Sequence, residues 1–336
     1  MTETVTNRPH FFVGIGGSGM LPLAIILRSA GASVAGSDRS RDQGRTPEKF
    51  TWLEAQDIAL HPQDGSGITS AEQVLVASAA VEDSVPEMVR ARELGCKRVS
   101  RAELLAALFN AAPLSIGVAG TSGKSTTTAM LGWILAHAGR DPTIMNGAVM
   151  NNFASSATPF ASARIGDSGV FVSELDQSDG SIAHYRPQVA VLLNISLDHK
   201  SMEELRALFG NFLAAAGTAA INVDDREAAA LIPPGRKVLR FGIHAPEAQL
   251  TVEQGSIAHS PARIAATVLD RRDGSAHRLD LPMPGSHNLA NALAAIAAAG
   301  LAGVSVAEAV AALAEFKGLA RRFDVLGTSP AGITVI

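Results

Sequence analysis

A glycine-rich segment with one lysine constrains this chain more than any other feature. Gly117–Thr128 reads GVAGTSGKSTTT, follows an apolar run and precedes a helix-like segment at residues 129–138. A strand that turns tightly into a helix presents backbone N–H groups and the positive helix end to an anion. The lysine can reach the outer phosphates, and the hydroxyl that follows it can ligate Mg²⁺. The segment therefore predicts a nucleotide triphosphate site on an α/β fold, in preference to a turn with a merely solvated lysine.

The glycine spacing distinguishes this loop from the common phosphate-binding pattern. That pattern has a glycine six residues before the lysine, where this chain has Val118. The motif present is GTxGK[ST]T, which resembles the ATP loop of the Mur ligase family, enzymes that add amino acids to the peptidoglycan precursor. The resemblance favours an ATP-dependent amide ligase over a GTPase or motor ATPase. It implies that ATP is bound by Gly120, Thr121, Ser122, Gly123, Lys124, Ser125 and Thr126.

Composition excludes several other classes of protein. The 336 residues suffice for two domains with cores of their own. A net charge of −4 provides no broad basic field for nucleic acid or anionic lipid. Cys96 is the only cysteine, and neither a signal-peptide pattern nor a long uninterrupted apolar run occurs. We therefore expect a cytoplasmic protein without nucleic-acid or membrane partners, and the oligomeric state stays open.

A second glycine motif lies near the N-terminus. GIGGSG satisfies GxGxxG, and an aspartate follows the second predicted strand, as in folds that bind NAD. The motif alone predicts a bound diphosphate and leaves a nicotinamide cofactor open. FFVGIGGSGM, with GSDRS at 36–40 and RAELL at 101–105, resembles the UDP-binding domain of the alanine-adding branch of the Mur ligases. The resemblance favours UDP-N-acetylmuramate, bound by Gly14, Ile15, Gly16, Gly17, Ser18, Gly19, Met20, Ser37 and Asp38.

Strand-like and helix-like runs alternate through two long segments. We predict an α/β chain with a Rossmann-like UDP-sugar-binding domain at 1–109 and a P-loop-type ATP-binding domain at 110–320, joined by a linker at 110–113. Residues 321–336 are expected to be the hinge and first strand of a third, Rossmann-like domain that is otherwise missing. The clearest predicted elements are strands at 10–13, 114–118, 170–173 and 189–194 and helices at 20–30, 102–108, 202–215, 287–299 and 306–316.

Two polar residues follow predicted buried strands of the second segment. Glu174 ends GVFVSE, and His199 comes shortly after VAVLLNI. Adjacent strand ends are where open α/β sheets bind ligands, and Mg²⁺ prefers oxygen ligands. A lone histidine after a strand is more often structural, but the nearby phosphate loop favours a functional role. The resemblance implies that Ser125, Glu174 and His199 hold Mg²⁺ and that Lys124, Glu174 and His199 are catalytic.

A departure from the family pattern narrows the branch. Several Mur ligases have a carbamylated lysine downstream of the DH motif, whereas no lysine occurs here between Lys200 and Lys237. The family implies that the alanine-adding branch manages without it. The absence therefore points to that branch and leaves the ligands of a second metal open.

Two later stretches also resemble the family. GSHNLANALAA at 285–295 is similar to the segment that recognises adenine, which implies that Asn288 and Asn291 bind the base. The alternative is an ordinary helix start capped by Ser286. GLARRFDVLG at 318–327 resembles the hinge into the third domain, which implies that Arg322 approaches the ATP phosphates.

The resemblance implies a sequential reaction with ATP and Mg²⁺. The lactyl carboxylate of UDP-N-acetylmuramate is phosphorylated, and the amine of L-alanine then displaces phosphate to form the amide. A recycling ligase that attaches a tripeptide stays open because of HYRP at 184–187, as does a non-catalytic nucleotide-binding protein of the same fold. Because the chain stops at Ile336 inside a predicted strand, we expect a truncated enzyme that is inactive alone, and a natural two-domain protein stays open as the alternative. The amine is expected to be an amino acid or short peptide and is not identified.

Overall fold

The computed structural model shows two α/β units. It describes residues 6–178, 180–198, 200–322, 327–328 and 334–335. The first unit contains the chain up to Ala112 together with Ser162–Ile165, and the second contains Pro113–Ala161 and the chain from Gly166 onward. In the part of the chain that is described, no helix is both long enough and apolar enough to span a bilayer.

The first unit is built on a parallel sheet in the order β3-β2-β1-β4-β5. Its strands are β1 (His10–Val13), β2 (Val34–Ser37), β3 (Ala59–His61), β4 (Val74–Ala77) and β5 (Lys97–Ser100). The central strands HFFV and VLVA are buried along their whole length, as expected for strands covered on both faces. Val13 pairs with Ser37, so the glycine motif after β1 and Asp38 after β2 emerge at the same edge of the sheet.

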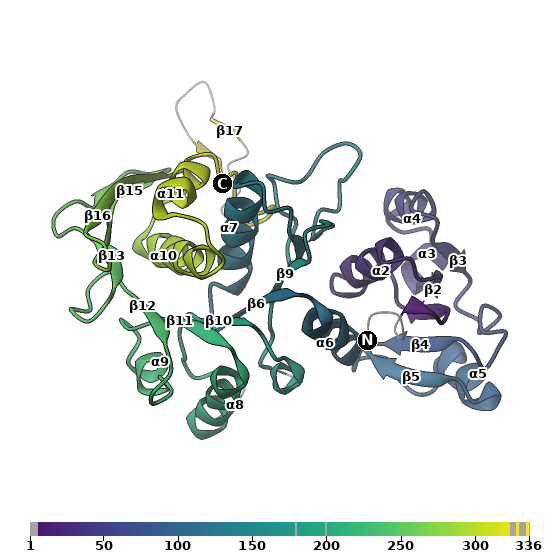
Figure 1. Ribbon diagram of the computed structural model, residues 1–336. Coiled ribbons are helices and arrows are strands. Elements are labelled where there is room, and N and C mark those ends of the chain that lie inside the picture. The colour runs from purple at the N-terminus through teal and green to yellow at the C-terminus, as the bar shows by residue number, and fades with distance from the viewer. Residues whose placement is uncertain (1–5, 179, 199, 323–326, 329–333, 336) are drawn as a thin grey trace. The chain divides into compact units, whose positions relative to one another are not determined.

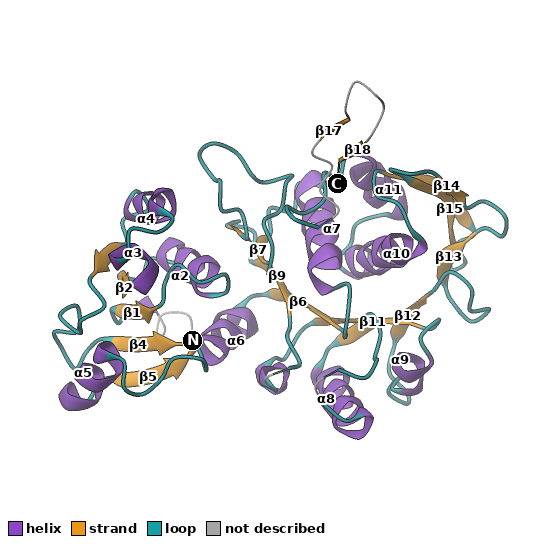
Figure 2. Cartoon of the chain, turned by 180° about the vertical axis from the view of Figure 1, so that it is seen from behind, coloured by secondary structure: helices purple, strands orange, loops and turns teal. Residues whose placement is uncertain are grey.

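Helices cover both faces of this sheet. They are α2 (Met20–Ser29), α3 (Arg39–Asp42), α4 (Pro47–Glu54), α5 (Pro86–Leu94) and α6 (Arg101–Ala111). Figure 2 shows α2 and α6 on the side of the sheet opposite to α5. A capping box between Ser100 and Glu103 starts α6. The helix continues to Ala111, so the start of the predicted linker at 110–113 was wrong. The buried side chains of Leu108 and Phe109 extend the apolar face of α6 into its last turn.

The second unit contains a mixed sheet in the order β14-β15-β13-β12-β11-β10-β6-β9-β7, with β16 paired to β15. The strands from β13 to β7 pair in parallel, and β14, β15 and β16 add antiparallel pairs at the other end. Their bounds are β6 (Leu114–Ala119), β7 (Thr143–Met145), β9 (Val170–Glu174), β10 (Val189–Leu192), β11 (Thr218–Asn222), β12 (Val238–Phe241), β13 (Leu250–Val252), β14 (Ala258–His259), β15 (Ile264–Asp270) and β16 (Ser275–Leu281). The remaining short elements are β8 (Ala163–Arg164), which belongs to the first unit, the 3₁₀ helix at Ser181–His184, and the antiparallel pair β17 (Gly327–Thr328) and β18 (Thr334–Val335).

Three helices form one layer over this sheet, namely α7 (Lys124–His137), α10 (Ser286–Leu301) and α11 (Val306–Ala314). The other face carries α8 (Met202–Ala215) and α9 (Arg226–Ala230), as Figure 1 shows. Alanines dominate the buried side of α10, which packs closely against α7. Small side chains allow two helix axes to approach one another, so this composition suits a helix enclosed by neighbours.

His10 makes the stability of the first unit depend on pH. Burial lowers the pKa of its imidazole, which is 3% exposed at the start of β1. The unfolded chain therefore takes up this proton at a higher pH than the native chain does. The stabilisation is complete above the ordinary histidine pKa and is lost as the pH falls through the lowered value. We expect a lower melting temperature at about pH 5.5 than at about pH 7.5 and a smaller difference in His10→Gln; an unchanged difference would assign the effect to other groups.

Candidate functional site

The loop between β6 and α7 lies at the carboxyl edge of the parallel strands. In the sheet, Val118 pairs with Glu174 at the end of β9, and Ala119 pairs with Leu192 at the end of β10. The loop therefore emerges between the ends of two neighbouring strands. Open α/β sheets bind their ligands at this position.

Gly123 is required by the backbone of this loop. Its φ of +86° is left-handed, and a Cβ atom there would lie 2.5 Å from Oδ1 of Asn291. Gly123 is the N-cap residue of α7, so the helix begins at Lys124, before the helix-like segment at 129–138. The N–H groups of a first helical turn have no partner within the helix, so this end of α7 can bind an anion.

Lys124 already has acceptors within the protein. Its ammonium donates to the carbonyl oxygens of Gly120 at 2.9 Å and Thr121 at 3.4 Å, and to Oε1 of Gln177 at 3.0 Å. Gln177 is 2% exposed, and its Nε2 donates to Asp198 Oδ2 at 3.3 Å. Gln177 was not predicted as a site residue from the sequence, although it lies in the polar stretch directly after β9. It holds the lysine side chain at the loop.

A cavity of about 330 Å³ brings together residues from distant parts of the chain. It is lined by Thr121, Ser122, Gly123, Lys124, Ser125, Glu174, Asp176 and Arg322. The predicted phosphate loop, the predicted metal carboxylate and the predicted phosphate-binding arginine thus share one cavity. Asp176 is an additional lining residue that the sequence did not predict. Thr126 is buried in the first turn of α7 and does not line the cavity.

Glu174 has one carboxylate oxygen without a hydrogen-bond donor. Its Oε2 is buried and has no hydrogen-bond partner, and any Cβ atom at Gly147 would overlap with Oε1. A buried carboxylate oxygen is costly unless it is paired, and a hard cation can pair with it. Ser125 lies in the same cavity, so these two residues fit a magnesium site. His199 lies outside the described residues, and within those residues no group of three His, Cys, Asp or Glu side chains forms a metal site.

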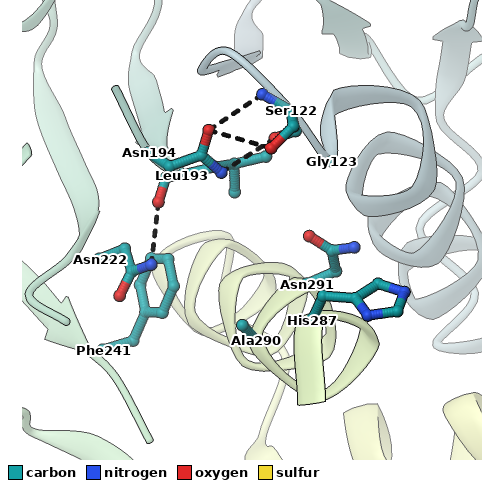
Figure 3. A pocket seen from close by; sticks show the side chains of 9 residues that line it. All are labelled: Ser122, Gly123, Leu193, Asn194, Asn222, Phe241, His287, Ala290 and Asn291. Atoms are coloured by element: carbon teal, nitrogen blue, oxygen red, sulfur yellow. Dashed lines mark hydrogen bonds between the residues drawn. The ribbon is translucent and has the colours of Figure 1, made fainter. Parts of the chain in front are cut away.

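A second cavity, of about 300 Å³, shares Ser122 and Gly123 with the first. Figure 3 shows it between the loop, the strand ends and α10. Its lining combines apolar surfaces with amide groups and consists of Ser122, Gly123, Leu193, Asn194, Asn222, Phe241, His287, Ala290 and Asn291. Asn194 is fixed by accepting from Ser122 N at 2.9 Å and donating to Ser122 O at 3.1 Å. Apolar faces with amide edges suit a planar heteroaromatic ring.

The two asparagines predicted to bind adenine have different surroundings. Asn291 lines the second cavity. Asn288 is not among the lining residues, and its Nδ2 donates to the carbonyl oxygen of Pro284 at 2.7 Å. The alternative prediction of a Ser286 cap was wrong, because α10 begins at Ser286 and Gly285 is its N-cap residue, without a side-chain hydrogen bond.

The first unit has a larger cavity, of about 550 Å³, at the glycine motif. Gly14, Gly16, Gly17 and Asp38 line it, together with Lys49 and other residues after β2 and β4. The Asp38 carboxylate accepts from Gly16 N and from Ser40 N, both at 2.8 Å, and so connects the glycine motif to the start of α3. Lys49 donates to the Gly16 carbonyl oxygen at 3.0 Å. The cavity therefore places a cation beside a glycine loop, a combination that suits a diphosphate.

Five of the predicted UDP-sugar residues do not line this cavity. Ile15 and Ser37 are fully buried, and Met20 is 4% exposed. Ser18 is exposed, and Gly19 is the N-cap residue of α2, where a Cβ atom would lie 3.1 Å from the Arg101 guanidinium. These residues shape the loop and the helix start.

Both units match known proteins. Residues 10–112 match the family described as "Mur ligase family, catalytic domain", and residues 118–299 match the "Mur ligase middle domain". A protein named UDP-N-acetylmuramate--L-alanine ligase from Synechococcus sp. (strain JA-3-3Ab) is 38% identical over 332 residues, which cover 97% of this chain and 61% of the relative. The protein of the same name from Novosphingobium aromaticivorans is 37% identical, over 97% of this chain and 69% of its own length. The chain thus spans less than two thirds of the first relative and somewhat more of the second.

Solved structures agree. The UDP-N-acetylmuramate-alanine ligase MurC from Thermotoga maritima superimposes with a TM-score of 0.81 at 28% identity, over 98% of this chain and 73% of that one. The UDP-N-acetylmuramate:L-alanyl-gamma-D-glutamyl-meso-diaminopimelate ligase from Neisseria meningitides gives a TM-score of 0.78 at 28% identity, over 94% of this chain and 99% of that one. With a glycine-rich loop, a carboxylate that has one oxygen without a hydrogen-bond partner and an arginine around one cavity, and with this similarity along both units, the chain belongs to the Mur ligase family.

Proposed function

We propose that this chain provides the UDP-sugar-binding and ATP-binding parts of an ATP- and Mg²⁺-dependent ligase that joins L-alanine to UDP-N-acetylmuramate in the cytoplasm. The cavity shared by Lys124, Ser125, Glu174 and Arg322 is the observation that carries the proposal. In it the first unit is a Rossmann-like domain for the sugar nucleotide and the second a P-loop-type domain for ATP. The names of the relatives from Synechococcus and Novosphingobium support the choice of substrate and amine.

The proposed phosphoryl transfer mainly requires that the reacting groups are positioned and that the phosphate charge is neutralised. Phosphoryl transfer from ATP to the lactyl carboxylate yields an acyl phosphate, and attack by the amine then forms the amide and releases phosphate. Lys124 can exchange its present acceptors within the protein for phosphate oxygens. Arg322, which lines the same cavity, can bind the phosphates as a second cation. Mg²⁺ held by Ser125 and Glu174 would neutralise phosphate charge. No protein nucleophile takes part.

A second candidate differs only in the amine. The Neisseria structure is named as a ligase that attaches a peptide to the same sugar nucleotide, and this chain matches 99% of it. A tripeptide is therefore an alternative to L-alanine. Both candidates share the two nucleotide sites, so they are distinguished by offering each amine to the active ligase and not by nucleotide binding.

The first unit provides the test of the substrate. At a hundredfold excess over its Kd, UDP-N-acetylmuramate should stabilise the unit by about 2.7 kcal/mol. For a unit of this size the melting temperature should rise by roughly 10 °C. NAD at the same concentration is the control because it presents a similar diphosphate. A shift with NAD and none with the UDP-sugar would contradict the proposed substrate and restore the nicotinamide cofactor as the ligand of the glycine motif.

A further inference from the structure

One loop of the second unit contacts both the start of α7 and the carboxylate of Glu174. That carboxylate lines the cavity of about 330 Å³ around Lys124 and Ser125, which we call the phosphate cavity because of the proposed function. This β7 loop, residues 146–152, follows β7 directly. Asn146 is 1% exposed, and its Nδ2 donates to the carbonyl oxygen of Ser125 at 3.0 Å. Gly147 lies against Glu174 so closely that any side chain at 147 would overlap with Oε1. The first half of the loop therefore packs against the two residues that fit a magnesium ion.

The second half of the β7 loop pairs with the segment 315–322, which follows α11. Ala320 N donates to Val149 O at 3.0 Å. Met150 and Leu319 form an antiparallel bridge, and each is 1% exposed. A loop and a segment separated by most of the unit's sequence are thus joined like two strands, with apolar side chains buried at the junction.

Two asparagine side chains extend this pairing. Asn152 donates from Nδ2 to Glu315 O at 3.0 Å and accepts at Oδ1 from Lys317 N at 2.7 Å. Asn151 donates from Nδ2 to Lys317 O at 3.1 Å, and its backbone N–H donates to Gly318 O at 3.1 Å. An amide side chain that donates and accepts at once replaces a backbone peptide group in the ladder.

The pairing ends at Arg322. Its backbone N–H donates to Leu319 O at 3.2 Å, closing a turn in which Arg321 has a left-handed φ of +63°. A non-glycine residue in that region persists only where neighbouring contacts hold the backbone. Arg322 lines the phosphate cavity although it lies far along the chain from Lys124 and Ser125. Its position over the cavity therefore depends on the pairing with the β7 loop.

We propose that Asn152, assisted by Asn151, is a positioning residue that fixes Arg322 over the phosphates of bound nucleotide. The β7 loop then connects the Glu174 side of the cavity to the Arg322 side. This inference rests on the proposed function, because it requires a nucleotide in the cavity. Pre-ordering the backbone of an arginine reduces the entropy that is lost when its guanidinium binds a phosphate, so removal of the asparagine contacts weakens binding without touching the nucleotide.

A double-mutant cycle on Mg-ATP affinity tests the inference. We expect Asn152→Ala and Arg322→Ala each to raise the Kd, measured by titration calorimetry, about tenfold. If Asn152 acts through Arg322, the double variant binds no more weakly than Arg322→Ala alone. Asn152→Asp keeps the acceptor for Lys317 N but loses the donor to Glu315 O, so its Kd should be intermediate. Thr158→Ala is the matched control, because its hydroxyl donates to Phe153 O at 2.9 Å, just after the β7 loop and outside the pairing with 315–322.

Each outcome of this cycle decides the inference. Wild-type affinity in Asn152→Ala, or a double variant weaker by the product of the two single effects, would overturn it and leave the proposed function intact. No Mg-ATP binding by the wild-type chain would overturn both. A lower melting temperature of Asn152→Ala does not change the decision. A general loss of stability would weaken Mg-ATP binding whether or not Arg322 is present, whereas an effect through Arg322 disappears in the Arg322→Ala background.

Discussion

Lys124→Ala should weaken the binding of Mg-ATP more than any other single substitution in this chain. A lysine bond to phosphate is charge-assisted, and its loss costs about 1.5–3 kcal/mol, or roughly 10- to 150-fold in Kd. The effect is limited to this range because the ammonium gives up existing bonds, including the one to Gln177 at 3.0 Å, when it turns to a phosphate. Titration calorimetry of Mg-ATP into the wild-type and variant chains measures the difference.

Lys237→Ala is the matched control for that experiment. Lys237 is an exposed lysine of the same unit, and it lines neither the cavity around Lys124 nor the cavity around Asn291. Lys237→Ala changes the net charge by the same amount as Lys124→Ala does, so a general electrostatic effect on binding would appear in both variants. Equal affinity of wild type and Lys124→Ala would mean that the glycine loop is structural, and the proposed ATP site would be wrong.

Glu174→Gln should remove most of the magnesium dependence of nucleotide binding. The carboxylate has a buried oxygen without a donor, and a neutral amide at the same position is a poor ligand for Mg²⁺. We expect ATP without Mg²⁺ to bind the variant about as well as it binds wild type, whereas adding Mg²⁺ should improve the affinity of wild type alone. Calorimetric titrations with and without the metal separate the two contributions.

The control carboxylate is Glu253, which is exposed on the same unit. Glu253→Gln should keep the full response to Mg²⁺. A Glu174→Gln chain that still responds to Mg²⁺ as wild type does would place the metal on other residues. In that case the unpaired oxygen of Glu174 would require a different explanation.

The apolar elements of the fold were predictable from sequence, whereas the short polar ones were not. The predicted strand at 10–13 and the predicted helix at 202–215 have the observed bounds, because their apolar patterns are continuous. Strand β5, KRVS, has a half-exposed edge position and no apolar signal. Helices α3 and α4 begin in a polar stretch whose structure depends on contacts such as that of Asp38 with Ser40 N. Such elements are fixed by their neighbours and not by their own periodicity.

For the site, local motifs predicted the loop but not its supporting contacts. GTSGKS is contiguous, and the strand that ends in Glu174 has a clear apolar pattern, so the sequence could place both at the same sheet edge. Gln177 and Asn152 have no local signature, because their partners lie far along the chain. Asn288 and Asn291 share a helical face in sequence, but Asn288 reaches back to Pro284 and so leaves only Asn291 at the cavity.

Phosphoryl transfer from ATP to the UDP-sugar, as we propose it, requires that one chain holds both nucleotides at the same time. The most direct measurement is a calorimetric titration of Mg-ATP into protein already saturated with UDP-N-acetylmuramate. We expect one bound Mg-ATP per chain with the UDP-sugar retained, and in Lys124→Ala the loss of the Mg-ATP signal alone. Displacement of the UDP-sugar by ATP, or binding of NAD in its place, would contradict the proposed function.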